Sequence, residues 1–403
     1  MNAALEFQDV DILFSREQGR KNARAIRDAL ARLDAGATRE EIAAACGVVV
    51  GVAGASLGIA PGEICVMMGL SGSGKSTLLR AANGLTAVTR GRVLIDDKNA
   101  PIDVARCGTE NLRRLRRERV AMVFQQFGLL PWRTVADNVG LGLELRGETP
   151  AERRKIVAEQ LELVGLTQWA DRDVGELSGG MQQRVGLARA FATKADILLM
   201  DEPFSALDPL IRDKLQDELL ALQERVKKTI LFVSHDLDEA LRLGDRISIM
   251  HHGRIVQTGR AQDIVLHPAD DYVAEFVRHM NPLTVLTGAM IMRPCAQMSR
   301  VDGALFLDDA RHYQLKLDPR DAPVELRLDG QAHPLRVVVD DAACAEDERA
   351  VIVAPASLSL QALIHLRRRT GHPVLLAEGG KVLGVCGEAE IIGALSARGS
   401  STA

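Results

Sequence analysis

The segment GLSGSGKST at residues 69–77 constrains the fold of this chain more than any other feature of the sequence. It follows EICVMM (63–68), a short apolar run typical of a buried strand, and it leads into STLLRAANGL, which we expect to be helical. Gly72 and Gly74 allow the backbone to approach phosphate oxygens without a Cβ clash, while the loop N–H groups and the helix N-terminus supply partial positive charge. The order of strand, glycine-rich loop and helix therefore predicts a polyphosphate site.

The chemistry of such a site gives individual loop residues separate tasks. We expect Lys75 to reach the β- and γ-phosphates of ATP, and the Ser76 hydroxyl to ligate Mg²⁺. The backbone of the rest of the loop is expected to surround the phosphates; it comprises Gly69, Ser71, Gly72, Ser73, Gly74 and Thr77. The alternative, a glycine-rich turn with a surface lysine, is disfavoured because a strand precedes the loop and a helix follows it.

A second anchor for the metal is predicted at ILLMDEP (197–203), where four apolar residues of a buried strand end in two acids. Asp201 is expected to hold Mg²⁺. Glu202 is the candidate general base that polarises the attacking water. A strand that simply ends in surface acids is the alternative, and the phosphate loop upstream makes it the weaker interpretation.

The chain as a whole alternates between predicted strands and helices. Strands are expected at 5–14, 63–68, 92–96, 120–124, 196–201, 229–236 and 246–250, and helices at 151–164, 179–193, 209–226 and 236–243. This alternation favours an α/β core with right-handed crossovers. Residues 16–46 form an amphipathic helical insertion, in which Thr38 and Glu41 have the spacing of a capping box. After about residue 283 the pattern changes to loop-rich β stretches, followed by a mixed helix and strand segment.

Composition excludes several classes of protein. The 403 residues include 50 Lys and Arg against 54 Asp and Glu, a net charge of −4, which argues against a dedicated nucleic-acid-binding protein. The sequence has neither an apolar run of the roughly 18–20 residues that cross a bilayer nor a basic secretory start. Six scattered cysteines are expected to be free thiols in a reducing compartment.

Four further motifs make the chain resemble the ATP-binding cassette (ABC) ATPases. LSGGM (177–181) resembles the family's signature motif, Gln125 in VFQQFGLLP its glutamine loop, SALD (205–208) its D-loop, and His235 in VSHD its switch histidine. With the phosphate loop, they occur in family order. The resemblance implies an α/β fold of the ABC-type P-loop ATPase class: a RecA-like parallel sheet core, an antiparallel β subdomain and a helical subdomain at about 128–178. This nucleotide-binding domain would span 1–282.

The resemblance also implies roles for individual residues. Gln125 would touch Mg²⁺ or the attacking water, and His235 would contact the γ-phosphate, so that both would act in catalysis with Glu202 and Lys75. Ser178, Gly179 and Gly180, which precede a predicted helix, would face the γ-phosphate bound by a second copy of the chain, with Asp208 at the same interface. ATP and Mg²⁺ are thus the implied ligands and a homodimer the implied assembly. Phe14 is the candidate to stack on adenine; an ordinary core phenylalanine is the alternative.

The insertion at 16–46 and the segment FQQFGLLPWRTVADNVGLGLEL resemble the importers of glycine betaine, proline and choline, most closely the choline members. The implied function is the ATP-hydrolysing motor subunit of a bacterial importer of choline or a related quaternary ammonium compound. The implied partners are an integral-membrane permease and a periplasmic or lipid-anchored substrate-binding protein, with no nucleic acid, at the cytoplasmic side of the inner membrane. Trp132 would be an anchor at the permease interface; a locally packed tryptophan is the alternative.

Aromatic residues make up only 3% of the chain, too few for the aromatic cage that typically holds a quaternary ammonium ion, so we expect another protein to bind the cargo. Alternatives to an import motor are a non-transport ABC ATPase acting in DNA repair or on ribosomes, an exporter, and a module that binds ATP without hydrolysing it. Residues 283–403 are expected to form a smaller α+β accessory domain. Within it, PVLLAEGGKVLGVCGEAEIIGAL (373–395) resembles the closing half of a cystathionine-β-synthase-type (CBS) regulatory module, without a clear first half in 301–355.

Overall fold

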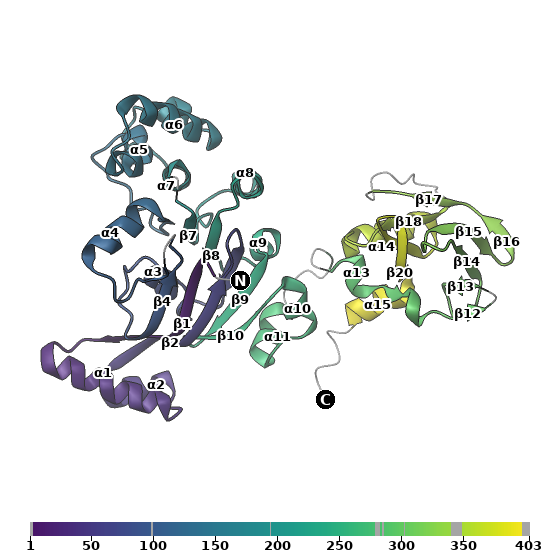
Figure 1. Cartoon of the computed structure of the whole chain (residues 1–403), viewed down its shortest axis with the longest axis horizontal. Helices are drawn as coiled ribbons and strands as arrows, with labels where there is room; N and C mark the ends of the chain where they lie inside the picture. Colours follow the sequence, from purple (N-terminus) through teal and green to yellow (C-terminus); the bar gives the residue numbers. More distant parts are fainter. Residues whose placement is uncertain are drawn as a thin grey trace. The chain divides into compact units, whose positions relative to one another are not determined.

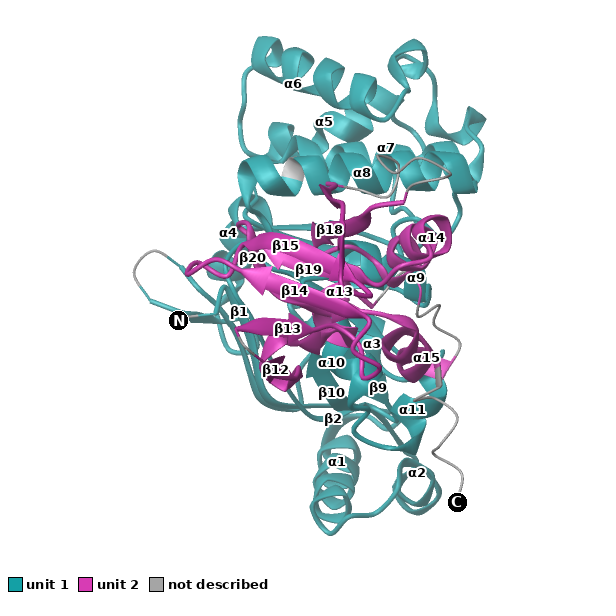
Figure 2. Cartoon of the chain, turned by 90° about the vertical axis from the view of Figure 1, so that its right-hand side faces the viewer, with its two compact units in different colours: residues 1–276 teal, residues 277–403 magenta. Residues whose placement is uncertain are grey.

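The structure of the chain is a computed structural model that describes residues 3–97, 100–193, 195–278, 283, 286–301, 303–339 and 349–396. The chain divides into two compact units, Met1–Phe276 and Val277–Ala403, drawn in teal and magenta in Figure 2. The first unit ends slightly before residue 282, where the sequence placed the boundary. Residues 279–282 lie outside the described part of the chain.

A six-stranded sheet forms the centre of the first unit (Figure 1). Its strands, in spatial order, are β10 (Arg254–Gly259), β9 (Arg246–His251), β3 (Ile64–Met68), β8 (Thr229–Val233), β7 (Ile197–Asp201) and β6 (Val120–Val123). All neighbours are parallel except β10, which pairs antiparallel with β9. Every residue of β3, β7 and β8 is buried, as expected of parallel strands covered on both faces. The carboxyl ends of these three adjacent strands therefore meet at one edge of the sheet.

Helices accompany these strands. Those that precede or connect strands are α3 (Lys75–Ala81), α4 (Thr109–Glu118), α7 (Gly179–Ala192), α8 (Pro209–Val226) and α9 (Leu237–Leu243), whereas α10 (Ala261–Leu266) and α11 (Asp271–Arg278) follow β10. Leu78 and Leu79 of α3 are fully buried in the main core, and burial of each side chain contributes about 1.5–3 kcal/mol. This packing fixes the helix that follows the glycine-rich loop.

An antiparallel sheet of four strands forms a second layer of the same unit. In spatial order it contains β2 (Val48–Ile59), β1 (Leu5–Ser15), β4 (Arg90–Ile95) and β5 (Ile102–Asp103). The strand predicted at 92–96 is β4, so it does not belong to the parallel core; its burial alternates because one of its faces is partly open to solvent.

The insertion predicted at 16–46 consists of two helices, α1 (Gly19–Asp34) and α2 (Arg39–Cys46), between β1 and β2 (Figure 1). The predicted capping box of α2 is confirmed, because the Thr38 side chain accepts from the Glu41 N–H and the Glu41 carboxylate accepts from the Thr38 N–H. The two helices and the start of β2 bury a small core of their own, which includes Ala29, Leu33 and Ile42.

A helical part follows β6 and contains α5 (Val135–Leu145), α6 (Pro150–Leu163) and two short 3₁₀ turns, η1 (Thr167–Trp169) and η2 (Val174–Glu176). Both helices contact α7, which returns the chain to the central sheet. The start of α6 carries two local signals, a Thr149–Glu152 capping box and Pro150 in its first turn. In the described part of the chain, no helix is both long and apolar enough to cross a membrane.

The second unit contains two sheets around a shared core. The first sheet has the order β11 (Arg293–Pro294), β20 (Lys381–Cys386), β19 (Val374–Glu378), β18 (Val351–Pro355) and β17 (Leu335–Val337). The second is antiparallel, with β12 (Arg300–Val301), β13 (Ala304–Phe306), β14 (Tyr313–Leu317), β15 (Pro323–Leu328) and β16 (Gln331–His333). The helical elements are α13 (Gly288–Ile291), η3 (Cys295–Gln297), α14 (Leu360–Thr370) and α15 (Glu388–Ser396).

The C-terminal unit is consistent with the CBS-like domain that the sequence predicted. From β18 onward the chain runs as strand, helix, strand, strand and helix, and the last three of these elements, β19, β20 and α15, make up the segment 373–395 that resembles the closing half of such a module. Most of the divergent segment 301–355 is occupied by the antiparallel sheet and β17. The five described cysteines of the whole chain are free thiols, as predicted, and Cys344 lies outside the described residues.

Candidate nucleotide site

A cavity of about 410 Å³ lies where β3, β7 and β8 end. Its lining consists of Ser71, Gly72, Gly74, Lys75, Ser76, Thr77, Gln125, Glu202 and His235. All nine residues were selected from the sequence, although they come from four separate segments of the chain. The parallel sheet brings them together because the phosphate loop, the Asp201–Glu202 pair and His235 each follow one of three neighbouring strands.

The loop glycines are required by the left-handed backbone of the loop and by its close packing against neighbouring strands. Gly69, Gly72 and Gly74 have φ angles of 141°, 77° and 105°. A Cβ on Gly69 would lie 2.2 Å from the carbonyl oxygen of Met250, and one on Gly74 would lie 2.5 Å from that of Gly51. A Cβ on Gly72 would meet no atom within 4 Å. The sequence argument assigned Gly72 and Gly74 to close phosphate approach; in the fold, Gly74 also permits close packing against β2, and Gly72 supplies the left-handed φ.

Lys75 is held by the loop that it belongs to. Its Nζ donates to the carbonyl oxygens of Gly69 at 2.7 Å and Leu70 at 3.1 Å. Burial lowers the pKa of Lys75 from its usual value, and the negative charges of Glu202 and Asp201 oppose this shift. The Ser73 Oγ is buried without a hydrogen-bond partner among the described residues. Lys75 lines the cavity, so a polyphosphate there could accept hydrogen bonds from its ammonium group, and the loop fits the ligand predicted for it.

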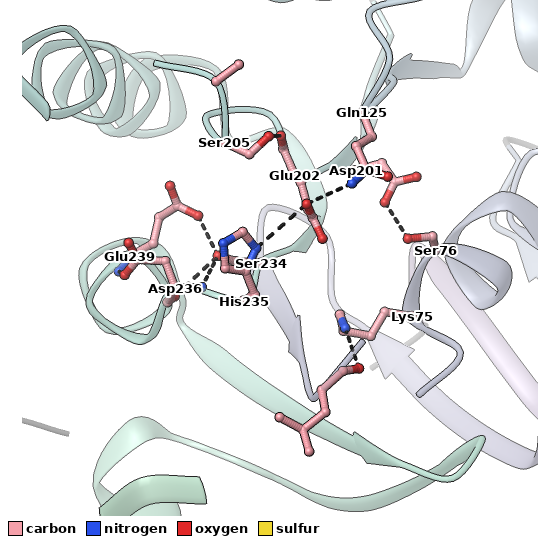
Figure 3. Close-up of polar contacts among 12 residues, drawn as sticks. Lys75, Ser76, Gln125, Asp201, Glu202, Ser205, Ser234, His235, Asp236 and Glu239 are labelled. Atoms are coloured by element: carbon pink, nitrogen blue, oxygen red, sulfur yellow. Dashed lines mark hydrogen bonds and ion pairs between the residues drawn. The ribbon is translucent and has the colours of Figure 1, made fainter. Parts of the chain in front are cut away.

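Ser76 and Asp201 form the pair expected to hold a metal ion. The Ser76 Oγ donates to Asp201 Oδ1 at 2.7 Å, and the Asp201 side chain is fully buried (Figure 3). Hydroxyl and carboxylate oxygens are ligands that Mg²⁺ prefers, and in nucleotide sites this ion takes few protein ligands beside phosphates and water. Accordingly, no cluster of three His, Cys, Asp or Glu side chains suited to a metal occurs among the described residues.

Glu202 occupies the centre of the cavity in a strained backbone conformation. Its φ is +49°, a left-handed value that favours glycine, and such values in other residues concentrate at functional sites. Its Oε2 accepts from Gln125 Nε2 at 2.9 Å and lies 3.7 Å from His235 Nδ1. Figure 3 shows Gln125 and His235 both pointing toward this carboxylate.

Sequence reasoning missed three residues that contact this site. Arg80 Nη2 donates to Asp201 Oδ2 at 2.9 Å, and Arg39 Nη1 of the insertion donates to the Gly72 carbonyl at 3.2 Å. Gln183 of α7 donates to the backbone carbonyl of Glu202 at 3.2 Å. Only Arg80 carried a usable signal, because it lies four residues after Ser76 and hence on the same face of α3.

The signature residues do not line the cavity of their own chain. Ser178 is the N-cap of α7, and its side chain accepts from the Met181 N–H at 3.4 Å. Ser178 and Gly179 are exposed, and Gly180 is half-buried. Asp208, also exposed, is the N-cap of α8. These residues are therefore free to contact a ligand or partner outside the chain.

Phe14 lies at the end of β1, beside the phosphate loop. Its side chain is 46% exposed, which does not fit an ordinary core phenylalanine. An ideal Cβ on Gly51 would lie 2.7 Å from Phe14 Cε2 and 3.3 Å from Thr77 Cγ2, so the ring and Thr77 border the same small space. The glycine at position 51 leaves room for the ring next to the loop.

A second cavity, of about 340 Å³, lies between the central sheet and the helical part. Its apolar lining includes Leu85, Val120, Met122, Phe124, Leu141 and Leu145, and its basic residues are Arg116, Arg117, Arg146 and Arg189. Trp132 does not line this groove; its side chain is 75% exposed, so it is not packed locally.

Comparison with known proteins agrees with this architecture. Residues 52–205 match the ABC transporter family. The chain is 51% identical over 261 residues to the glycine betaine/proline betaine transport system ATP-binding protein ProV of Escherichia coli K12, which covers 65% of this chain and 64% of ProV. It is 48% identical over 247 residues to the trimethylamine N-oxide transport system ATP-binding protein TmoW of Ruegeria pomeroyi, covering 61% of this chain and 72% of TmoW.

A solved structure has the same fold. The dimeric post-hydrolysis structure of the ATP-binding cassette MJ0796, bound to ADP and Pi, superposes with a TM-score of 0.53 at 30% identity, covering 64% of this chain and 98% of that one. The fold and the site thus define an ATP-binding cassette. The chain belongs to the ATP-binding protein family of ABC transporters. The aligned segment spans slightly less than two thirds of the length of ProV.

Proposed function

We propose that this chain is the ATP-hydrolysing motor subunit of an ABC importer for quaternary ammonium or related methylated amine compounds. The observation that carries the proposal is the convergence of Lys75, Ser76 and Glu202 on one cavity, with the buried Asp201 hydrogen-bonded to Ser76. That cavity lies in a cassette that is 51% identical to a glycine betaine/proline betaine transport ATP-binding protein.

In the proposed reaction the chain's own groups position ATP and activate water. The loop from Gly69 to Thr77 surrounds the phosphates, and Lys75 exchanges its loop carbonyl partners for phosphate oxygens. Ser76 and Asp201 would hold Mg²⁺, which would supply positive charge to neutralise the phosphates. The Glu202 carboxylate accepts a proton from the attacking water.

Gln125 and His235 supply orientation in this scheme. Both approach the Glu202 carboxylate from opposite sides, Gln125 as a hydrogen-bond donor and His235 at 3.7 Å. A water between Glu202 and the γ-phosphate would lie within reach of both side chains. We assign Phe14, beside Thr77, to the adenine ring, since an exposed aromatic face next to a phosphate loop fits a purine.

The site is completed by a second copy of the chain. Ser178, Gly179 and Gly180 are absent from the lining of their own cavity, and their N–H groups begin a helix of 14 residues. A helix start of this kind suits an anion such as the γ-phosphate of the partner's ATP. Asp208 would lie at the same interface. The dimeric arrangement of the MJ0796 cassette, 30% identical to this chain, supports this assembly.

The permease is expected to dock at the groove between the central sheet and the helical part. Its apolar lining and basic rim suit an amphipathic helix with acidic ends, because such a helix buries its apolar face and pairs its charges. Trp132, exposed after the Gln125 segment, would anchor the same contact. This docking would hold the chain at the cytoplasmic side of the membrane.

The cargo class follows from the names of the relatives and from composition. ProV and TmoW are named for glycine betaine/proline betaine and trimethylamine N-oxide, all methylated amine compounds. Choline, the cargo favoured by the sequence, belongs to the same class. Two Trp and two Tyr in the whole chain cannot form a convincing cage, so a separate substrate-binding protein would select the cargo. A role in DNA repair or on ribosomes is not favoured, because these relatives are transport proteins.

Phosphate release by the full chain tests the proposal. Glu202→Gln should bind ATP with unchanged affinity, hydrolyse it at least about a hundredfold more slowly because the general base is lost, and accumulate as a dimer in light scattering. Lys75→Ala should weaken ATP binding in calorimetry. Full turnover by the Glu202→Gln variant would exclude Glu202 as the base.

ATP-dependent uptake of labelled glycine betaine or choline into vesicles that also contain the permease and its binding protein tests the cargo.

A further inference from the structure

Gln183 joins the signature helix to the catalytic segment through a fully buried side chain. It lies in the second turn of α7, which begins directly after Ser178, and its exposed fraction is 0%. Its Nε2 donates to the carbonyl oxygen of Glu202 at 3.2 Å, and its Oε1 accepts from the Ala206 N–H at 3.0 Å. The nitrogen and the oxygen of the Gln183 amide therefore both bind the backbone of residues 202–206, which runs from the candidate base into the D-loop.

The two hydrogen bonds of Gln183 hold a segment whose backbone is strained at Glu202. Glu202 has a φ of +49°, and its N–H donates to the carbonyl oxygen of Val233 at 3.1 Å. Its carbonyl oxygen also accepts from Ser205 Oγ at 3.1 Å. A left-handed residue other than glycine persists only where the surroundings fix it from several sides. Gln183 provides the contact that comes from α7.

We propose that Gln183 is a positioning residue for ATP hydrolysis: it fixes the backbone of residues 202–206 so that the Glu202 carboxylate faces the water. The inference rests on the proposed function. It further implies that α7, whose first residues would contact the partner's nucleotide, is coupled to the base of its own chain through one side chain. Nothing in the sequence motifs assigns this task to Gln183.

If Gln183 had a purely structural role, its substitution would have different effects. A buried amide with both groups satisfied stabilises the fold wherever it occurs, and its loss would then affect only stability. A positioning role affects the rate of the chemical step and leaves ATP affinity intact, because Lys75 and the loop are unchanged. It also acts through Glu202, so its effect should disappear when Glu202 is already replaced.

The matched control is Gln223. It is also a buried helical glutamine, and its Nε2 donates to the carbonyl oxygen of Gly62. Gly62 precedes β3, at the edge of the sheet opposite to the phosphate loop. Gln223→Leu therefore removes one buried side-chain hydrogen bond from the same unit without contacting residues 202–206.

The experiment measures ATP affinity and steady-state hydrolysis of the full chain carrying Gln183→Leu, Gln183→Glu or Gln223→Leu. We expect Gln183→Leu to lower kcat by about tenfold to a hundredfold, with a Kd for ATP within about twofold of the unmodified chain, because displacement of a catalytic group by about 1 Å has effects of this size. Gln183→Glu keeps the acceptor for Ala206 but places a carboxylate against the Glu202 carbonyl oxygen, so it should lose at least as much. Gln223→Leu should retain kcat even where its thermal stability falls.

A double variant separates the possible outcomes. In the Glu202→Gln background, Gln183→Leu should cause no further loss of rate. An unchanged kcat in both Gln183 variants, or an equal loss in both backgrounds, would overturn the inference while leaving the proposed function intact. A chain in which Glu202→Gln itself has no effect would instead overturn the proposed function. If Gln183→Leu does not fold, Gln183→Glu and its double variant give the same comparison.

Discussion

At the scale of single residues, the two acids that end β7 have opposite environments. Asp201 is fully buried, and its two oxygens are bound by Ser76 and Arg80. Glu202, the next residue, is partly open to the cavity and faces Gln125. A rigid, buried carboxylate suits a metal ligand, and a carboxylate at a cavity surface suits proton transfer with water. Because the backbone at Glu202 is left-handed, the side chains of these two neighbours reach different environments and suit different tasks.

The Arg80–Asp201 ion pair gives a residue-scale prediction. Arg80→Ala should lower the free energy of unfolding by about 1–3 kcal/mol, since it leaves a buried carboxylate short of a donor, and urea denaturation measures this. We also expect the Mg²⁺ concentration for half-maximal hydrolysis to rise about tenfold, because groups that orient a metal ligand have effects of this size.

Arg90→Ala is the control, because Arg90 pairs with the buried Asp11 at a similar exposure, 45% against 42% for Arg80. It should lose at least as much stability, because Arg90 also pairs with Asp34, but its metal requirement should not change. If Arg80 acted only through its positive charge, its removal would favour Mg²⁺ binding and lower the Mg²⁺ requirement. A lower Mg²⁺ requirement in Arg80→Ala would therefore mean that the orientation argument is wrong.

At the scale of elements, the helical insertion is attached to the phosphate loop. The capping box of Thr38 and Glu41 fixes the start of α2, and Arg39 is the first residue of this helix. From there its guanidinium reaches the carbonyl of Gly72. The insertion thus supports the phosphate loop through a contact between residues that are 33 positions apart in the sequence, which local patterns do not reveal.

This contact predicts an effect of the insertion on nucleotide binding. Arg39→Ala should weaken ATP binding by about twofold to tenfold, the equivalent of a net hydrogen bond of about 0.5–1.5 kcal/mol, as measured by calorimetry. Arg39→Lys should retain part of the affinity. Arg20→Ala, an exposed arginine on α1, is the control and should bind ATP normally. Equal affinities for Arg39→Ala and the unmodified chain would show that the loop does not depend on the insertion.

At the scale of the whole molecule, the two units have separate hydrophobic cores. The main core of the first unit contains Phe7, Met67 and Leu199, whereas that of the second contains Leu315 and other residues beyond 276 only. Each unit therefore buries apolar side chains against its own elements, which is the condition for independent folding.

Truncation tests this separation. A fragment of residues 1–278, which keeps α11 whole, should fold cooperatively and bind ATP with an affinity within about twofold of the full chain. Circular dichroism during thermal unfolding and calorimetry measure the two properties. Loss of the cooperative transition in the fragment would mean that the first unit depends on the second for its stability.

The sequence alone determined the features that depend on neighbours along the chain. The glycine loop between β3 and α3, the capping box at Thr38 and the full extent of α8 follow from local backbone preferences and spacing. Motif order also identified every residue that lines the nucleotide cavity. Tertiary structure decided the rest, because it depends on groups far apart in sequence. Only the fold assigned β4 to the antiparallel sheet, packed Gly74 against Gly51, and brought Arg80 to Asp201 and Gln183 to Glu202.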